Sequence, residues 1–125
     1  MTLYPDDILD HYRNPRHFGC RDELVHTHES KRHNPSCGDQ MYMRLRVKHG
    51  VIEHICFTGV GCALSTAAAS LITEAVEGKN ISEVRELQAQ DILTLLQIPV
   101  TPVRMKCALI GYEALQECVN SASTK

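Results

Sequence analysis

The feature of this sequence that most constrains its fold is a pair of extended segments separated by a short turn. From 41 to 47, Met, Met, Leu and Val alternate with Tyr and two Arg. A period of two is that of a strand with one buried face. The segment Lys48-His49-Gly50-Val51 predicts a hairpin turn. Residues 52–58 are therefore expected to return as a second strand, with Ile55 and Phe57 on the core face.

Helical patterns precede and follow this hairpin. A first helix is expected from Pro5 to the stop at Asn14-Pro15, because Pro suits the first helical position. Cys62 is expected to open a long alanine-rich helix that Gly78 ends. The expected apolar stripe of that long helix is Leu64, Ala68, Leu71, Ile72 and Ala75.

The rest of the chain completes a small α+β domain. We expect a short strand at 24–28, a short helix with Ser82 as its N-cap, another at 91–96, and a final helix over 104–119. Three antiparallel strands with helices packed on one face follow from this order. The length predicts a single domain over residues 1–125.

Composition excludes several classes of function. Thirteen basic and 15 acidic residues give a formal net charge of −2, with no basic stripe for nucleic acid. The N-terminus lacks the pattern of a signal peptide, and no apolar run is long enough to cross a membrane. We therefore expect a cytoplasmic protein in a reducing compartment. Its six cysteines favour metal binding or thiol chemistry over three disulfides.

Three of the cysteines lie in settings suited to a metal. Cys37 lies in Asn-Pro-Ser-Cys-Gly-Asp, Cys62 follows Gly-Val-Gly, and Cys107 follows Arg-Met-Lys. Cys62 and Cys107 fall where helices are expected to begin, and helix N-termini stabilise thiolates. Asp39 adds an oxygen ligand two residues after Cys37. Cys20, Cys56 and Cys118 lack such settings and are interpreted as small buried residues.

The expected hairpin brings most of these side chains to one end of the sheet. Cys37 and Asp39 precede its first strand and Cys62 follows its second, whereas Cys107 must arrive from the last helix. Three sulfurs and one carboxylate suffice for a tetrahedral Zn²⁺ site or a small iron–sulfur cluster. The sequence has no Cys-x-x-Cys hook, which argues against a purely structural zinc site.

Four segments in order resemble the NifU/IscU/SufU-type iron–sulfur cluster assembly proteins. They are Asp-His-Tyr-Arg-Asn-Pro at 10–15, Asn-Pro-Ser-Cys-Gly-Asp at 34–39, Gly-Val-Gly-Cys at 59–62 and Lys-Cys-Ala at 106–108. The resemblance implies a SufE/NifU-like fold and a cysteine desulfurase as partner. It also implies that Cys37, Asp39, Cys62 and Cys107 bind the metal or cluster, with Cys107 as the candidate persulfide acceptor.

Two branches of that family share features with this chain. Lys106 before Cys107 resembles the zinc-dependent sulfur-acceptor branch, while the short spacing from Cys62 to Cys107 resembles the scaffold branch. The scaffold's chaperone motif is reduced to Val-Thr-Pro-Val-Arg at 100–104, which argues against recognition by an Hsp70-type chaperone.

Three functions remain open from the sequence. The leading one is a scaffold, not an enzyme, that accepts sulfur, binds iron and builds a transient [2Fe-2S] cluster for recipient apoproteins. The second is a sulfurtransferase that holds Zn²⁺ at the same four residues. The third is a small zinc-stabilised interaction domain without chemistry.

Overall fold

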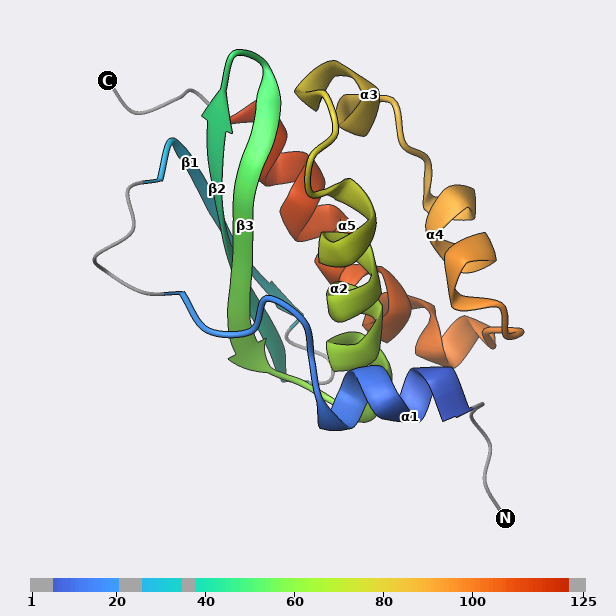
Figure 1. Ribbon diagram of the computed structural model, residues 1–125. Coiled ribbons are helices and arrows are strands. Elements are labelled where there is room, and N and C mark those ends of the chain that lie inside the picture. Colours follow the sequence, from blue (N-terminus) through green and yellow to red (C-terminus); the bar gives the residue numbers. More distant parts are fainter. Residues whose placement is uncertain (1–5, 21–25, 35–37, 122–125) are drawn as a thin grey trace.

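The computed structural model describes residues 6–20, 26–34 and 38–121, and its fold is α+β. Three antiparallel strands form one sheet in the order β1-β2-β3, and helices α2 and α5 pack on one of its faces (Figure 1). The elements are α1 (Asp6–Arg13), β1 (His28–Asn34), β2 (Asp39–Lys48), β3 (Val51–Val60), α2 (Ala63–Val76), α3 (Ile81–Arg85), α4 (Ala89–Leu96), the 3-10 helix η1 (Pro102–Arg104) and α5 (Met105–Asn120).

The β2–β3 hairpin confirms the prediction from alternation. Lys48 pairs with Val51, so that His49 and Gly50 form the turn. On the helix side, Met43 pairs with Phe57, and both side chains are buried. The alternating apolar side chains thus fix which face of the sheet the helices cover.

The first strand differs from the expectation in its position. A strand at 24–28 was expected, but β1 runs over His28–Asn34, and residues 24 and 25 lie outside the described residues. The sequence shows no apolar alternation here because β1 is a polar edge strand. Its buried Ser30 donates a hydrogen bond to the Ala114 carbonyl at 2.6 Å. Its last residue, Asn34, pairs with Asp39, the first residue of β2.

The helices confirm their predicted positions, but two details were wrong. Cys62 is the N-cap of α2, and Gly78, with φ +87°, follows its end. Ala75 is exposed, and Val76 takes its expected place in the core. The N-cap of α3 is Asn80 and not Ser82, because Asn80 forms a capping box with Glu83.

Two apolar clusters hold the layers together. The larger one fills the space between the sheet and helices α2 and α5. The smaller one lies where α1, α2, α4 and α5 meet, and contains Ile8, Leu64, Leu96 and the ligand candidate Cys107. The smaller cluster therefore packs directly behind residues expected to handle metal.

Residues 14–20, which we call the strap, connect α1 to the edge of the sheet. The amide of Phe57 in β3 donates to the carbonyl of His17 at 3.0 Å, and the Gly19 amide donates to the Phe57 carbonyl at 2.8 Å. The rings of Phe18 and Phe57 meet edge to face, 5.3 Å apart. The strap also reaches α2, where the Arg16 amide donates to the Ser70 hydroxyl at 2.8 Å.

The strap ends in a disulfide that the sequence analysis missed. Cys20 is bonded to Cys56 of β3, with a Cα–Cα distance of 5.4 Å. Cys56 is buried as expected, whereas Cys20 is only partly buried. The bond itself was not predicted, because it depends on pairing of the strap with β3, which brings two cysteines 36 positions apart into reach of each other. Cys118 fits the interpretation as a small buried residue, since it carries a thiol and has no exposed surface.

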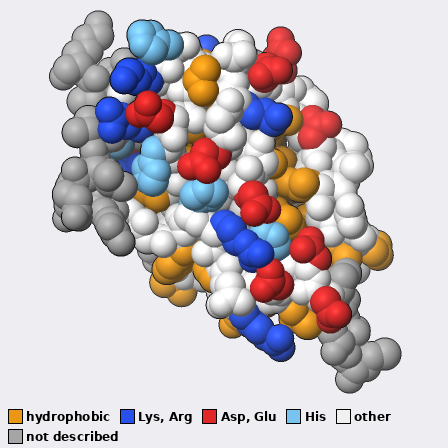
Figure 2. Space-filling view, in the orientation of Figure 1, with side chains coloured by type: hydrophobic (Ala, Val, Ile, Leu, Met, Phe, Trp, Pro, Cys, Tyr) orange, Lys and Arg blue, Asp and Glu red, His pale blue; other side chains and the backbone are white. Residues whose placement is uncertain are grey.

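The surface is electrostatically mixed. On the face shown in Figure 2, acidic and basic side chains lie among one another together with histidines, in keeping with the small net charge. Among the residues that the structure describes, no helix is both long and apolar enough to cross a membrane.

Candidate metal centre

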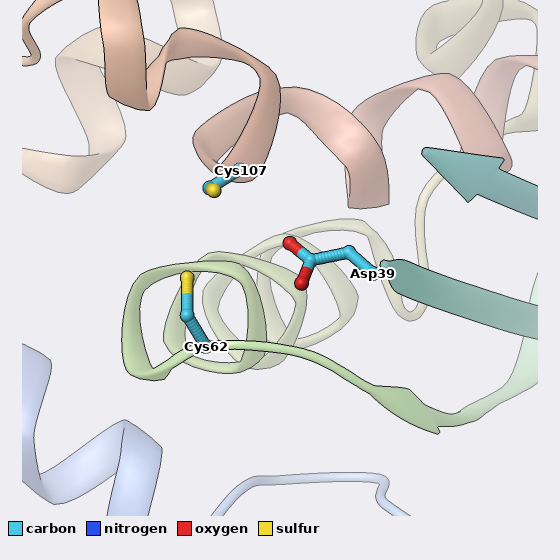
Figure 3. A group of neighbouring side chains, drawn as sticks. All are labelled: Asp39, Cys62 and Cys107. Carbon is cyan, nitrogen blue, oxygen red and sulfur yellow. The ribbon is translucent and has the colours of Figure 1, made fainter. Parts of the chain in front are cut away.

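Three of the four predicted ligands converge at one end of the sheet. Asp39 is the first residue of β2, Cys62 is the N-cap of α2, and Cys107 lies in the first turn of α5. Their ligand atoms all lie within 4.8 Å of one another, and the side chains point toward a common centre (Figure 3). The fourth, Cys37, lies outside the described residues. Metal binding by this set stays a prediction.

Among these three residues, Asp39 has an unusual environment for a carboxylate. Its side chain is 5% exposed, and within the described residues its Oδ2 has no hydrogen-bond partner. Removing a polar oxygen from water without a new partner destabilises a fold, so such atoms are uncommon in native proteins. A cation between the carboxylate and the two sulfurs would satisfy this oxygen, which shows that the donor set fits a metal.

The position of Cys62 at the start of α2 affects the pKa of its thiol. Burial acts to raise the pKa of its thiol, but hydrogen bonds from the Ser65 hydroxyl and amide, from Cys107 and from the Leu64 amide together lower that pKa. The Ser65 hydroxyl lies 3.4 Å from the Cys62 sulfur and also donates to the Cys62 carbonyl at 3.1 Å. Cys62 is therefore more readily deprotonated than an ordinary cysteine, as a metal ligand or sulfur acceptor must be.

Two glycines permit the close packing around the site. A side chain at Gly59 would place its Cβ 2.1 Å from the Gln40 carbonyl oxygen in β2. At Gly61 the Cβ would lie 2.4 Å from the Ser65 hydroxyl and 3.5 Å from the Asp39 carboxyl carbon. Gly61 therefore sets the spacing between the segment carrying Cys62 and its neighbours.

Ser65 is a contributor that the sequence analysis missed. It is fully buried and lies one helical turn after Cys62. Its position three residues after an N-cap cysteine was the available signal, because a side chain there lies over the first turn. It went unnoticed because serine at that position also fits the run of small residues that packs α2.

Comparison with known proteins identifies the family to which the chain belongs. Residues 3–125 match the family model described as NifU-like N terminal domain. The chain belongs to this family, as the four motifs indicated.

Relatives with two different names match almost the whole chain. The iron-sulfur cluster assembly scaffold protein IscU of Escherichia coli (strain K12) is 32% identical and aligns over 98% of this chain and 95% of its own length. The zinc-dependent sulfurtransferase SufU of Bacillus subtilis (strain 168) is 30% identical, over 94% of this chain and 90% of its own. This chain is thus comparably similar to a scaffold and to a sulfurtransferase.

Solved structures agree on the fold. A hypothetical protein whose crystal structure was determined at 2.3 Å resolution is 30% identical and superposes with a TM-score of 0.76, covering 95% of this chain and 98% of its own. The putative iron-sulfur cluster assembly scaffold protein for the SUF system from Fervidobacterium islandicum AW-1 has a TM-score of 0.74 at 22% identity, with 94% and 96% covered. The second likeness bears on the fold alone.

Proposed function

We propose that this chain is a cytoplasmic iron–sulfur cluster assembly scaffold. It accepts sulfur from a cysteine desulfurase, binds iron at Cys37, Asp39, Cys62 and Cys107, and delivers a transient [2Fe-2S] cluster to recipient apoproteins. The IscU relative, similar over nearly the whole chain, supports this assignment. In this reading iron and cluster are the cargo that the protein handles.

The observation that carries the proposal is the buried Oδ2 of Asp39, which has no partner in the described residues and lies beside two thiols. A structural site holds its metal most firmly with four soft ligands of one kind, as in Cys₄ zinc sites. A carboxylate is instead a hard ligand, and it holds soft iron less firmly than a thiolate does. A single oxygen ligand among sulfurs supports a site that releases what it binds.

The thiols of the site have the chemistry required to accept sulfur. A thiolate of the scaffold attacks the outer sulfur of the desulfurase persulfide, an S–S bond breaks, and the desulfurase cysteine leaves as a thiolate. The new S–S bond is on the scaffold cysteine. We assign this acceptance to Cys107, which lies in the first turn of α5 beside Cys62. Its thiol is buried, so acceptance of sulfur from a partner's cysteine requires a local opening of the site. The neighbouring Cys62 has a lowered thiol pKa and is therefore more readily deprotonated than an ordinary cysteine.

A second candidate function is zinc-dependent sulfur transfer. Lys106 is exposed directly before Cys107, and the relative from Bacillus subtilis is named a zinc-dependent sulfurtransferase. Bound Zn²⁺ would neutralise the charge of the gathered thiolates and hold the loops in place. In this reading the metal is a resident cofactor, and the product is a persulfide on the protein.

The experiment that separates the two candidates compares the wild type with Asp39→Ala. Both proteins are incubated anaerobically with ferrous iron, L-cysteine and a desulfurase, and the visible spectrum and desulfurase turnover are followed. A scaffold should show a cluster spectrum in the wild type and a longer-lived cluster in the variant, with persulfide transfer retained.

The control is Glu53→Gln, because Glu53 is an exposed carboxylate on the same sheet and pairs with Arg46 at 2.9 Å. It should behave as the wild type. Absence of any cluster, with zinc-dependent stimulation of the desulfurase lost in Asp39→Ala, would favour the sulfurtransferase. Zinc binding with neither activity would leave only an interaction domain and refute both.

A further inference from the structure

The strap is held to the fold by the polar contacts of His17 and by one covalent bond. His17 lies within 3.2 Å of the Thr73 hydroxyl through Nδ1 and within 3.0 Å of the Glu77 carboxylate through Nε2. Both partners belong to the C-terminal half of α2 or follow it directly. The Cys20–Cys56 disulfide fixes the other end of the strap to β3. Within the described residues, the strap thus bridges the sheet and the helical layer.

The disulfide lies outside both apolar clusters of the described residues. Ile55 and Phe57 belong to the larger cluster, whereas Cys56 between them belongs to neither. Successive residues of a strand point to opposite faces, so Cys56 lies on the face of the sheet away from α2 and α5. Breaking this bond therefore leaves the main core intact, and the strap can respond locally.

The two sulfurs differ in how easily they can be attacked. Cys20 is partly exposed, whereas Cys56 is 4% exposed. A thiolate from solution reaches the Cys20 sulfur first, which makes Cys56 the leaving thiolate. This asymmetry is what ordered thiol–disulfide exchange requires.

We propose that Cys20 and Cys56 form a reversible thiol–disulfide site, separate from the metal centre, whose reduction by a dithiol releases the strap. One thiolate of the dithiol attacks the Cys20 sulfur, and Cys56 leaves and takes a proton. The second thiol then attacks the mixed disulfide and frees Cys20. Two electrons and two protons pass to the cysteine pair, and the dithiol becomes a disulfide. Intracellular disulfides are more often of this transient kind than structural.

The strap transmits its state to the helix that precedes it. Arg16 of the strap pairs with Asp10 of α1 at 2.6 Å. On the opposite side of α1, Ile8 packs with Leu64 and Cys107 in the smaller cluster. Release of the strap removes a restraint on α1 and thereby on the apolar packing behind the candidate metal centre. The redox state of the cysteine pair would therefore determine how tightly α1 packs against α2 and α5, the helices that carry Cys62 and Cys107.

The first arm of the test measures the couple itself in the folded wild-type chain. The protein is equilibrated in dithiothreitol buffers of graded redox poise, alkylated, and analysed by mass spectrometry. Cys20 and Cys56 should titrate together as one two-electron couple while the protein remains folded. The proposal fails if no bond between them forms under oxidising buffer, or if it yields only after global unfolding.

The second arm measures the structural response by hydrogen exchange. Upon reduction, the amides of Gly19 and Phe57 should exchange roughly tenfold faster or more, and those of residues 10–13 should follow in the same direction. The amide of Met43 in β2 serves as the internal control and should not change. Equal protection in both redox states at Gly19 and Phe57 would overturn the proposal.

A variant provides an independent check without reductant. Cys20→Ser with Cys56→Ser should reproduce the exchange pattern of the reduced wild type. If the exchange rates of the double variant matched those of the oxidised wild type instead, the disulfide would not restrain the strap and the proposal would be wrong. Because neither arm uses metal, the outcome is independent of the proposed scaffold function.

Discussion

The carboxylate of Asp39 and the thiol of Cys62 place ligand atoms within 4.8 Å of each other from the two free ends of one β-hairpin. Asp39 begins β2, and Cys62 follows the end of β3. Since the strands of an antiparallel hairpin begin and end at the same edge, this pairing needs no long connection. The hairpin therefore determines where these two ligands lie, and the site can be tested by substitutions that leave the hairpin unchanged.

Asp39→Ala should have opposite effects on stability with and without metal. In the presence of a chelator it removes a buried oxygen that has no partner in the described residues, so the free energy of unfolding should rise by about 1–3 kcal/mol. With zinc in excess, the wild type should gain stability by mass action and the variant should gain less. Urea unfolding under both conditions measures this. A variant less stable than the wild type in chelator would contradict it.

The ligand set can be separated from the other cysteines. Cys37→Ser, Cys62→Ser and Cys107→Ser should each lower zinc affinity by at least about tenfold, since each removes a thiolate ligand. Competition with a chromophoric chelator measures the affinity. The control is Cys118→Ala, because the Cys118 thiol is buried and its pKa is raised to about 12. Equal losses in all four variants would refute the assignment.

Ser65→Ala should make Cys62 less reactive in the metal-free protein at neutral pH. The hydrogen bonds of Ser65 help to hold the pKa of the Cys62 thiol below its ordinary value of 9.0. Their loss raises that pKa, so at pH 7 less thiolate is present and iodoacetamide reacts more slowly. Well above both pKa values the rates should converge. Measurement of the alkylation rate against pH by mass spectrometry tests this; an unchanged midpoint would show that Ser65 does not act on the thiol.

Two glycine substitutions should distinguish site geometry from helix packing. Gly61→Ala places a methyl group against the Ser65 hydroxyl and should weaken zinc binding. Gly111→Ala places one 3.2 Å from Ala69 between α5 and α2, and overpacking of this kind costs about 1–3 kcal/mol of stability. Zinc affinity of the Gly111 variant should stay near that of the wild type. Calorimetric melting and zinc titration of both proteins provide the comparison, which fails if the two effects are exchanged.

Asn80→Ala should destabilise the fold by about 1 kcal/mol, because it removes the capping box of α3. Ser82→Ala, the substitution at the position first expected to cap this helix, should change stability by less than about 0.5 kcal/mol, as for an ordinary surface site. Each substitution removes one polar side-chain group at the start of the same short helix: an amide at Asn80 and a hydroxyl at Ser82. Thermal unfolding of both variants measures this difference. Equal losses of stability would show that Asn80 is not the N-cap.

The sequence was sufficient where local chemistry determines structure. The alternation at 41–47 located β2 and its buried face, and Cys62 was recognised at the start of α2. It was insufficient where structure depends on distant partners. The β1 strand is polar at its exposed positions and is defined by pairing with β2, not by its own apolar pattern.

The candidate site shows the same division. Cys62 and Asp39 were placed together from the order of strands alone, whereas the position of Cys107 depends on how α5 packs. The bond between Cys20 and Cys56 could not be predicted from spacing, since it requires that the strap lie along β3. Absence of a secretion pattern argued against disulfides as a class, and that argument does not extend to one pair brought together by the fold.

The strap has a further consequence for how molecules of this protein meet one another. β3 is an edge strand, and the backbone N–H and C=O of Phe57 that face outward are already bonded to His17 and Gly19. Edge strands with such groups unpaired are templates for strand addition between chains and for aggregation. A molecule with its strap in place resists polymerisation through this edge, and a released strap offers both the groups and the exposed ring of Phe18 to a neighbour. Seven residues that lie outside any helix or strand thus cover part of one of the two edges of the sheet.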